Sequence, residues 1–203
     1  MGEERKQPGI GFPQQEAAWI RSFLAGERDG FDALVLSYKD RIFNLCFRLL
    51  DGDHEEANDS AQETFVKMYR SLNQFRFDSS FSTWIYAIAV NTCKNKLKSA
   101  EFRNRKRRLS LDPVCGTGEC ASFPRLEDPA PSPLAQLEAK ERQALVHQCI
   151  DALPEDAREL IVLRDIEGFS YEEITLITGY HLGTVKSKLA RARRRLCEAL
   201  KGA

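Results

Sequence analysis

The sequence predicts an all-α protein made of two small helical domains that are joined by a flexible linker. Apolar residues recur at three- and four-residue steps in two long stretches, and neither stretch alternates as a half-buried strand would. Between them lies a segment with glycines and several closely spaced prolines, which cannot build a hydrophobic core. A chain of 203 residues is long enough for two such domains.

Composition divides the chain into four segments. Residues 1–15 are rich in proline and glycine and are predicted to form a disordered tail. We expect the first helical domain at 16–100, the linker at 101–136 and the second helical domain at 137–203.

The first domain is predicted to hold three main helices. The first of them has a continuous apolar face of three- and four-residue steps. Asp53, with Glu56 three positions later, is predicted to cap the second helix. A loop at 75–80 separates this helix from the third, which is predicted to begin at Phe81.

The second domain is predicted to hold four helices whose ends carry local signals. Pro154 suits the start of the second of these helices, because the first turn does not need its missing N–H. Ser170 and Glu173 have the spacing of a capping box for the third, and Gly179 suits the left-handed residue that ends it. Thr184 is predicted to cap the last helix.

Charge is balanced overall but unevenly distributed. The chain has 30 basic and 30 acidic side chains, and a neutral total alone argues against a nucleic-acid-binding protein. Residues 182–203, however, carry seven basic side chains against one acidic, and residues 100–111 carry five against one. Residues 138–181 carry ten acidic side chains against four basic. Two basic blocks in an acidic background indicate local surfaces for a polyanion.

The C-terminal end matches the pattern of a helix-turn-helix motif. A short helix at about 171–178, a turn with glycines and a longer basic helix at 184–200 have the required order. In this motif the second helix enters the major groove, where basic side chains bind guanine or phosphate. The pattern therefore favours duplex DNA over a merely solvated basic face. The candidate contacts on the last helix are Lys186, Ser187, Lys188, Arg191 and Arg194.

The third helix of the first domain starts with aromatic residues and continues with amides and lysines. Rings that stack on unpaired bases, amides that read base edges and lysines that hold the backbone suit single-stranded nucleic acid. An aromatic core with a solvated outer face explains the composition equally well, so both interpretations stay open. The residues are Phe75, Phe77, Phe81, Trp84, Tyr86, Asn91, Lys94, Asn95, Lys96 and Lys98.

Two sets of motifs resemble a single family. Residues 81–91 (FSTWIYAIAVN), preceded by residues 62–65 (QETF), resemble region 2 of the extracytoplasmic-function (ECF) sigma factors of bacterial RNA polymerase, in particular the envelope-stress sigma-E type. Residues 153–155 (LPE), 164–174 (RDIEGFSYEEI) and 183–188 (GTVKSK) resemble region 4 of the same family. The resemblance covers both helical domains in order, with a linker between them and no region 3.

The resemblance implies a promoter-recognition factor and not an enzyme. Region 2 would dock on the clamp helices of the largest subunit of core RNA polymerase, melt the −10 element and capture a base. Region 4 would read the −35 element of promoter DNA in the major groove, with its acidic side toward the polymerase flap. The family implies no catalytic residue, metal, cofactor or small-molecule substrate, and a monomer in the holoenzyme. The resemblance also implies a cytoplasmic location and a further partner, an anti-sigma factor, which can be membrane-bound and hold the protein at the inner membrane.

The resemblance and the residue patterns together assign the site residues. Binding to core polymerase is assigned to Asp59, Gln62, Glu63 and Phe65. Binding to the −10 element is assigned to Phe75, Phe81, Trp84, Tyr86, Asn91, Lys94, Asn95 and Lys98. Among these, Asn91 matches the position that contacts a base extruded from the stack. Binding to the −35 element is assigned to Arg164, Thr184, Lys186, Ser187, Lys188, Arg191 and Arg194.

The chain departs from the family pattern in three places. Phe77 stands where similar sequences often have glycine, which alters the predicted base pocket. Lys188 replaces a frequent arginine, and lysine lacks the planar fork that binds guanine at two atoms. Cys115 and Cys120 of the linker have no counterpart in the family, match no standard metal spacing and are assigned no role.

Two other functions remain open at the level of the sequence. An ordinary helix-turn-helix regulator with a helical sensor domain would bind duplex DNA tightly without polymerase. A metal-dependent nuclease would use clustered carboxylates to hold Mg²⁺, although acidic residues also stabilise a helix N-terminus without metal. The carboxylates concerned are Asp51, Asp53, Glu55, Glu56, Asp59 and Glu63.

Overall fold

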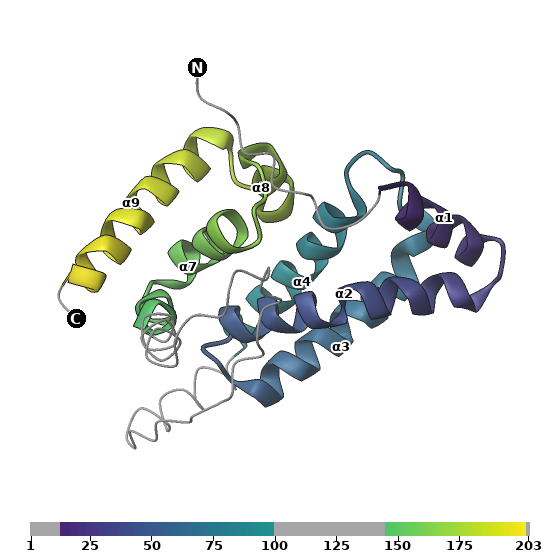
Figure 1. The fold of residues 1–203 in the computed structure, drawn as a ribbon, viewed down its shortest axis with the longest axis horizontal. Coiled ribbons are helices and arrows are strands. Elements are labelled where there is room, and N and C mark those ends of the chain that lie inside the picture. The colour runs from purple at the N-terminus through teal and green to yellow at the C-terminus, as the bar shows by residue number, and fades with distance from the viewer. Residues whose placement is uncertain (1–12, 100–144, 202–203) are drawn as a thin grey trace, which may run out of the picture.

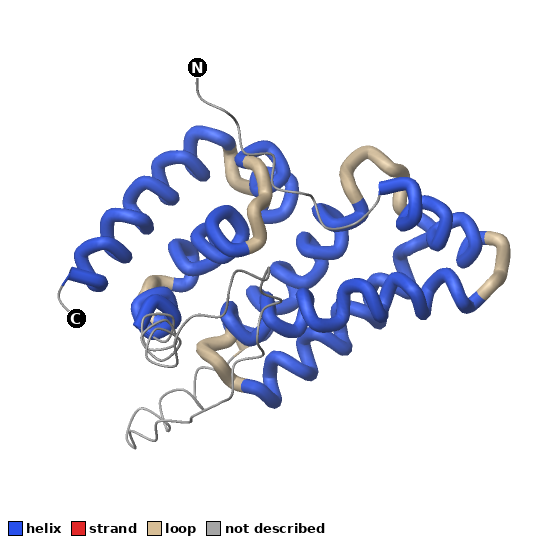
Figure 2. Tube along the Cα trace, in the orientation of Figure 1, coloured by secondary structure: helices blue, strands red, loops and turns tan. Residues whose placement is uncertain are grey.

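The computed structural model describes residues 13–99 and 145–201, which form a set of packed helices joined by short loops (Figure 1, Figure 2). No strand occurs in these two ranges, so the predicted all-α class is confirmed. The predicted linker at 101–136 lies outside the described residues, as does most of the predicted tail. Residues 13–15 are an exception, because they form the first turn of a helix and not a tail. Within the described ranges, every helix is too short or too polar to span a bilayer.

The N-terminal part consists of four helices, three of which pack against the second. They are α1 (Pro13–Leu24), α2 (Arg28–Leu49), α3 (His54–Ser71) and α4 (Phe81–Lys98), with a short 3-10 turn, η1 (Leu72–Gln74), after α3. The second helix contacts each of the other three. Its apolar face is buried as its spacing predicts, and the core of this part includes Leu34, Ile42, Leu45, Ala57, Met68, Leu72 and Ile85.

The close contact between α1 and α2 depends on Gly30. A Cβ atom at this position would lie 2.3 Å from the carbonyl oxygen of Trp19 and 3.0 Å from the backbone nitrogen of Phe23. Both atoms belong to the backbone of α1, which cannot yield as a flexible side chain would. Any side chain at position 30 would therefore push α1 away from α2.

The C-terminal part follows residues 145–151, which are helical. It continues with α7 (Glu155–Ile161), a π-helical turn η2 (Val162–Ile166), α8 (Tyr171–Thr178) and α9 (Leu182–Lys201). The π-helical turn was not predicted. Side chains from all of these helices form the core of this part, among them Leu160, Ile161, Ile174, Val185 and Leu189.

Most predicted helix ends are confirmed. The Ser170 side chain accepts from the backbone N–H of Glu173 at 3.1 Å, and the Glu173 carboxylate accepts from the N–H of Ser170 at 2.9 Å. Gly179 ends α8 with φ +76°. The predicted cap at Thr184 is wrong, because the N–H of Val185 already donates to the carbonyl of His181 at 3.0 Å and α9 begins at Leu182.

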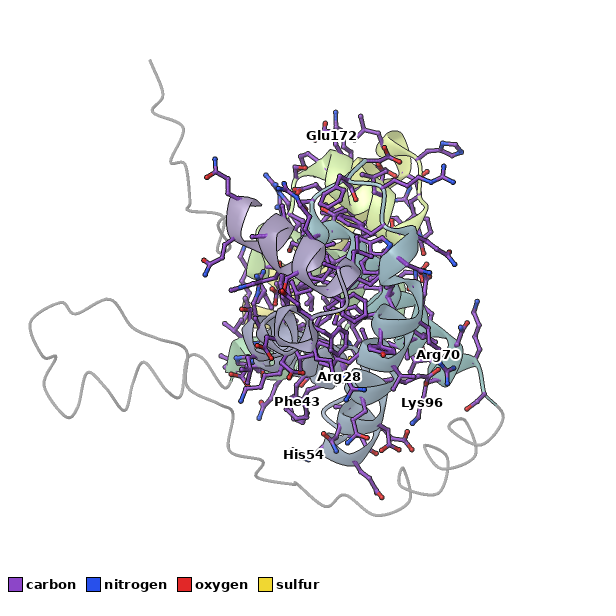
Figure 3. The ribbon with its side chains drawn as sticks, turned by 90° about the vertical axis from the view of Figure 1, so that its right-hand side faces the viewer. Arg28, Phe43, His54, Arg70, Lys96 and Glu172 are labelled. Carbon is purple, nitrogen blue, oxygen red and sulfur yellow. The ribbon has the colours of Figure 1, made fainter. Side chains whose placement is uncertain are left out.

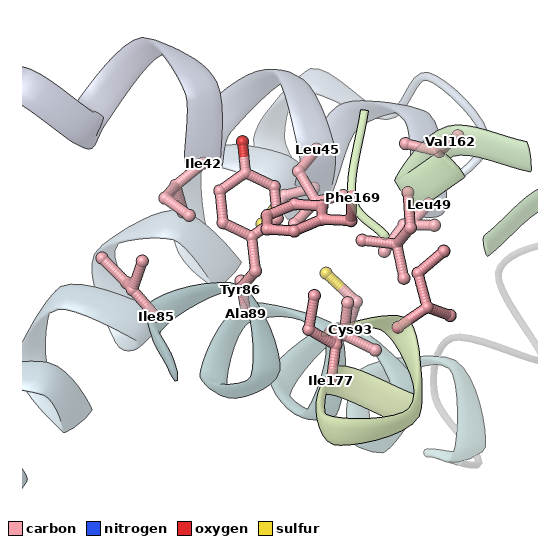
Figure 4. Close-up of a cluster of buried hydrophobic side chains, with 14 of the residues drawn as sticks. Ile42, Leu45, Leu49, Ile85, Tyr86, Ala89, Cys93, Val162, Phe169 and Ile177 are labelled. Atoms are coloured by element: carbon pink, nitrogen blue, oxygen red, sulfur yellow. The ribbon is translucent and has the colours of Figure 1, made fainter. Parts of the chain in front are cut away.

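The two parts pack against each other, with α4 lying along α8 (Figure 1). Tyr86, Ala89 and Cys93 of the N-terminal part face Phe169 and Ile177 of the C-terminal part, and all five are buried (Figure 4). The rings of Tyr86 and Phe169 meet edge-on, with centroids 4.7 Å apart. We call this contact surface, defined by these five residues, the seam. It makes the hydrophobic core continuous between the two parts.

Candidate nucleic-acid interface

Helix α9 turns a basic face to solvent. Its apolar residues Val185, Leu189 and Ala192 are buried against the rest of the C-terminal part. The predicted contacts Lys186, Ser187, Arg191 and Arg194 are exposed. The Arg194 side chain is 73% exposed, and its contact with Glu198 is long, at 4.0 Å. The helix therefore offers solvent-accessible cations along one side, as a helix that binds in a major groove requires.

The other two predicted DNA contacts on α9, Lys188 and Thr184, already interact with neighbouring residues. Lys188 Nζ lies 2.5 Å from a carboxylate oxygen of Asp156 and 4.9 Å from the centre of the Tyr180 ring. The hydrogen bond from Lys188 lowers the pKa of Asp156 and raises the pKa of Lys188 itself. Thr184 is half-buried, and its backbone carbonyl accepts from the hydroxyl of Ser187 at 3.1 Å.

Arg164 supports the turn that leads into α8. Its guanidinium donates to the backbone carbonyl of Phe169 at 2.7 Å and lies 4.7 Å from the centre of the Tyr171 ring. Lys186 approaches the same ring at 5.9 Å, so the two predicted cations lie on one side of the helix-turn-helix. A half-buried arginine held in this way is positioned before any ligand arrives.

The aromatic residues at the start of α4 are mostly interior, so for most of them the structure favours an aromatic core over an exposed stacking face. Phe75, Phe81 and Tyr86 are buried, and Trp84 is half-buried. The ring of Phe81 packs edge-on against Tyr38 of α2 at 5.3 Å, because these rings fill the space between the two helices. Composition alone could not distinguish this packing from an exposed stacking face.

Phe77 is the exception in this aromatic cluster. It is 51% exposed and has a left-handed backbone with φ +60°. For a residue other than glycine this conformation costs about 1–2 kcal/mol, because Cβ crowds the following carbonyl. The position at which the sequence departs from the family pattern is therefore also the position whose backbone would suit glycine.

The polar contacts predicted on α4 divide into exposed and paired residues. Asn91, Asn95 and Lys98 are exposed. Lys94 is half-buried and pairs with Glu159 of α7 across 2.9 Å. Its ammonium group also lies 5.2 Å from the centre of the Tyr180 ring. Lys94 and Lys188 thus share one aromatic side chain, although they come from opposite parts of the chain.

The Glu159 carboxylate is the most deeply buried charge at this contact. Burial raises its pKa, and the ammonium group of Lys94 opposes that shift. The packed state thus binds the proton more tightly than the unfolded chain does. The stabilising contribution of Glu159 is fully present below its ordinary pKa of about 4.5 and is lost as the pH rises through the raised value.

Polar groups tie the parts together around the seam. The Tyr86 hydroxyl donates to the Glu167 carboxylate at 2.5 Å, and Arg41 lies 3.8 Å from the same oxygen. Burial and the negative charge of Glu167 both raise the pKa of Tyr86, so the hydroxyl keeps its proton. The Thr83 hydroxyl donates to the Glu173 carboxylate at 3.3 Å.

A buried arginine forms a second connection between the parts. Arg158 of α7 is 3% exposed and donates to the carboxylate of Asp51, in the turn between α2 and α3. It also donates to the backbone carbonyls of Asp151 and Leu153. Its two terminal nitrogens are shared among these three acceptors, which offsets part of the cost of burying the charge.

The predicted polymerase-binding residues lie on α3. Asp59, Gln62 and Glu63 are exposed, whereas Phe65 is half-buried and packs against the core. Val66, which is 47% exposed, supplies the apolar surface beside the acidic residues. The sequence does not single out Val66, because a residue next to a core position gives no separate signal.

The carboxylates proposed for a nuclease have other partners. The Asp53 side chain caps α3 by accepting from the N–H of Glu56 at 3.1 Å. Lys96 lies beside α3, 2.5 Å from Glu56 and 3.6 Å from Asp59 (Figure 3). Among the residues that the structure describes, no group of three or more His, Cys, Asp or Glu side chains is arranged to hold a metal ion. Cys115 and Cys120 lie outside these residues.

Comparisons with known proteins match both parts of the chain. The family profile described as Sigma-70 region 2 matches residues 34–103, and the profile described as Sigma-70, region 4 matches residues 143–196. The RNA polymerase sigma-H factor of Pseudomonas aeruginosa is 41% identical over 191 residues, which cover 92% of this chain and 94% of that protein. The ECF RNA polymerase sigma-E factor of Escherichia coli is 35% identical over 168 residues, covering 83% and 85%.

Two solved structures have a similar fold. CnrH in complex with the cytosolic domain of CnrY gives a TM-score of 0.60 at 22% identity, covering 94% of this chain and 97% of that one. The sigma factor RpoE in complex with the anti-sigma factor NepR, from Bartonella quintana, gives a TM-score of 0.60 at 26% identity, covering 86% and 98%.

Proposed function

The chain belongs to the ECF branch of the sigma-70 family, and from this membership we propose that it directs core RNA polymerase to promoters with defined −10 and −35 elements. It supplies recognition, and the polymerase supplies the chemistry. The observation that carries the proposal is the presence of two different binding surfaces in one chain. One is the exposed basic face of α9, and the other is the exposed acidic row of α3 with Val66 beside it.

Helix α9 is the element for the −35 duplex. Lys186, Ser187 and Arg191 point to solvent from its N-terminal half, the part of a recognition helix that reaches base edges. Arg194 lies three residues beyond Arg191 and is suited to a phosphate. Arg164 contributes from the π-helical turn η2, before α8, and Thr184 contributes from the first turn of α9.

The N-terminal part carries the −10 and polymerase functions. Asn91, Asn95 and Lys98 give α4 an exposed polar side, which suits an unpaired strand. Asp59, Gln62 and Glu63 form an acidic row on the exposed side of α3. Its two carboxylates lie 3.6 Å and 2.8 Å from lysine ammonium groups, those of Lys96 and Lys67, and such alternating charge suits a protein partner better than DNA. We assign this row to core polymerase.

The packed arrangement must open for both elements to be bound at once. The centres of the −10 and −35 elements lie about 25 base pairs apart, which is about 85 Å along B-form DNA. In this structure α4 and α8 are in direct contact, with ring centroids 4.7 Å apart at the seam. Residues 100–144 reach about 150 Å when fully extended, so the chain connection allows the separation. We infer that the seam parts when the chain joins polymerase.

Partners and location follow from the same membership. The RpoE structure contains an anti-sigma factor, and we propose a regulator of this class for the present chain. Such a regulator would act by holding the seam closed or by covering α3. We place the chain in the cytoplasm, where polymerase is found, with an anti-sigma factor that is either soluble or anchored in the membrane.

Run-off transcription over a promoter library tests the function directly. Core polymerase with this chain is expected to give transcripts from one class of promoter, and neither component alone should do so. Tight binding of the isolated chain to the selected duplex would instead favour an ordinary regulator. DNA cleavage by the pure chain with Mg²⁺ would favour a nuclease.

The Asn91→Ala variant tests the proposed −10 surface of α4 separately from the proposed polymerase-binding row of α3. The variant is expected to impair promoter opening while its affinity for core polymerase stays unchanged, because Asn91 is exposed on α4 and does not belong to the α3 row. Ser37→Ala on the exposed side of α2 is the control. An equal loss of opening and polymerase affinity would contradict the −10 assignment.

A further inference from the structure

His147 makes a side-chain contact that joins the two parts of the chain. It lies in the helical stretch 145–151, before α7, whereas Arg48 lies in the last turn of α2. The Nη1 atom of Arg48 lies 3.1 Å from Nδ1 of His147, although the two residues are 99 positions apart. Arg48 is 8% exposed and His147 is half-buried, so water screens the contact only in part. Separation of the two parts would break it.

The chemistry of these two side chains fixes the protonation state of His147. A guanidinium has donors but no acceptor, and it does not lose its charge in a protein. Nδ1 of His147 must therefore accept the hydrogen bond, so the ring is neutral and carries its proton on Nε2. A proton on Nδ1 would remove the acceptor and leave two cations in contact. The contact with Arg48 thus requires a neutral His147.

The charges that the described residues place around His147 balance while its ring is neutral. Arg158 of α7 donates to the carboxylate of Asp51, in the turn between α2 and α3, and to the backbone carbonyl of Asp151. Arg48 and Arg158 supply two positive charges. Asp51 and Asp151 supply two negative ones, and Asp151 lies one helical turn after His147. Protonation of His147 would add an unbalanced positive charge where the two parts meet.

The pKa of His147 reflects these surroundings. Burial and the charge of Arg48 both lower it from its ordinary value of about 6.5, and Asp151 opposes them. The contribution of His147 to packing is therefore fully present above pH 6.5 and is lost as the pH falls through the lowered value. The pKa values of Asp151 and Glu159 are raised from 3.8 and 4.5, so these carboxylates act in the opposite direction. A His147 variant is needed to separate its share from theirs.

We propose that the contact between His147 and Arg48 is a pH switch, which holds the two parts together near neutral pH and favours the open chain when His147 is protonated. The open chain is the form that joins polymerase, so the proposal rests on the proposed function. It gives the chain a means of control that needs no partner protein.

Single-molecule fluorescence energy transfer in the free chain tests the proposal. Dyes on the exposed Cys197 of α9 and on Arg28→Cys of α2, with Cys115 and Cys120 replaced by serine, distinguish packed from open molecules. The reference is His147→Asn, which keeps an acceptor near the Nδ1 position and cannot be protonated. Relative to this variant, the wild-type ratio of packed to open chain should fall between pH 7.5 and 5.5. The fall is at most about 10-fold, the limit for one site with an ordinary pKa of 6.5.

A control variant and a second measurement complete the test. His181→Asn removes an exposed histidine from the turn before α9 and should leave the pH response unchanged. The chain has three histidines, so nitrogen-15 chemical shifts can resolve each ring, and His147 should carry its proton on Nε2 at pH 7.5. A proton on Nδ1 would overturn the proposal, and so would equal pH responses of the wild type and His147→Asn. A holoenzyme that transcribes no promoter would instead refute the proposed function without changing the pH response of the free chain.

Discussion

Removal of a single hydroxyl from the edge of the seam tests whether the chain has to open. Tyr86→Phe deletes the O–H that donates to Glu167 across 2.5 Å and leaves the ring against Phe169. Tyr86 is fully buried, so no water can replace the lost donor in the packed form. In the open form the same hydroxyl would meet water. The substitution therefore acts on the packed form selectively.

The expected magnitude follows from the charge on the acceptor. A hydrogen bond to a charged group contributes about 1.5–3 kcal/mol when its loss leaves the partner buried. Arg41 remains 3.8 Å from the Glu167 carboxylate and moderates the loss, so we expect the lower part of this range, about 1.5–2 kcal/mol. The ratio of packed to open chain should then fall about 10- to 30-fold.

Distances measured by pulsed electron paramagnetic resonance report this ratio. One spin label is attached to the exposed Cys197 of α9 and the other to Arg28→Cys at the start of α2, with Cys115 and Cys120 replaced by serine. The long-distance population should grow relative to the short one in Tyr86→Phe. If polymerase binds only the open chain, its apparent affinity should rise with the open fraction.

Tyr38→Phe is a matched control. Tyr38 is also buried and also donates its hydroxyl to a carboxylate, that of Glu16, but both residues belong to the N-terminal part. This variant should lower the free energy of unfolding and leave the distance distribution unchanged. The reasoning is refuted if Tyr86→Phe leaves the distances as they are, or if both variants change them equally.

Three further variants test other steps. Arg191→Ala should weaken −35 recognition by about 1–3 kcal/mol if Arg191 contacts a base, and an equal loss on promoters without the preferred −35 sequence would show a phosphate contact. Glu159→Gln should reduce the loss of stability that accompanies rising pH above about 4.5, because an amide does not titrate, whereas Asp151, whose pKa burial also raises, still does. Urea unfolding from pH 4 to 8 measures this, and parallel curves for the two proteins would contradict it. Ser170→Ala should lower the free energy of unfolding by about 0.5–2 kcal/mol through loss of the α8 cap, and an unchanged denaturation midpoint would show that the cap contributes nothing.

The features that the sequence predicted correctly are those encoded over a few residues. The cap formed by Ser170 and Glu173 spans three positions, and the left-handed Gly179 is a property of one residue. The α-helical class and the apolar faces follow from periodicity over one or two turns. The start of α9 was misplaced by two residues, since the helix accepts its first hydrogen bond at the carbonyl of His181 before any side chain can cap it.

The seam could not be predicted because its contacts join distant segments. Tyr86 and Glu167 are 81 positions apart, and Thr83 and Glu173 are 90 apart. An acidic residue such as Glu167 looks like any solvated charge in the sequence, and only its place in the fold makes it a partner for a buried hydroxyl. The same limitation applies to the aromatic residues of α4, because the side of a helix that faces the core depends on its neighbours.

Lys188 and Lys94, two of the predicted DNA contacts, each pair with a carboxylate in this structure, and the two pairs differ in how far they are exposed to solvent. Lys188 and Asp156 are both substantially exposed, with side chains 31% and 58% accessible, and such a surface pair contributes little and yields readily to a phosphate. Lys94 pairs with a carboxylate that is only 6% exposed and belongs to the other part of the chain. If these lysines bind DNA as proposed, we expect DNA to recruit Lys188 from the packed form, whereas Lys94 becomes available only when α7 and α8 move away from α4. We therefore expect the basic face of α9 and the exposed amides of α4 to be accessible in the packed form, and Lys94 to join the proposed −10 surface only after the seam parts.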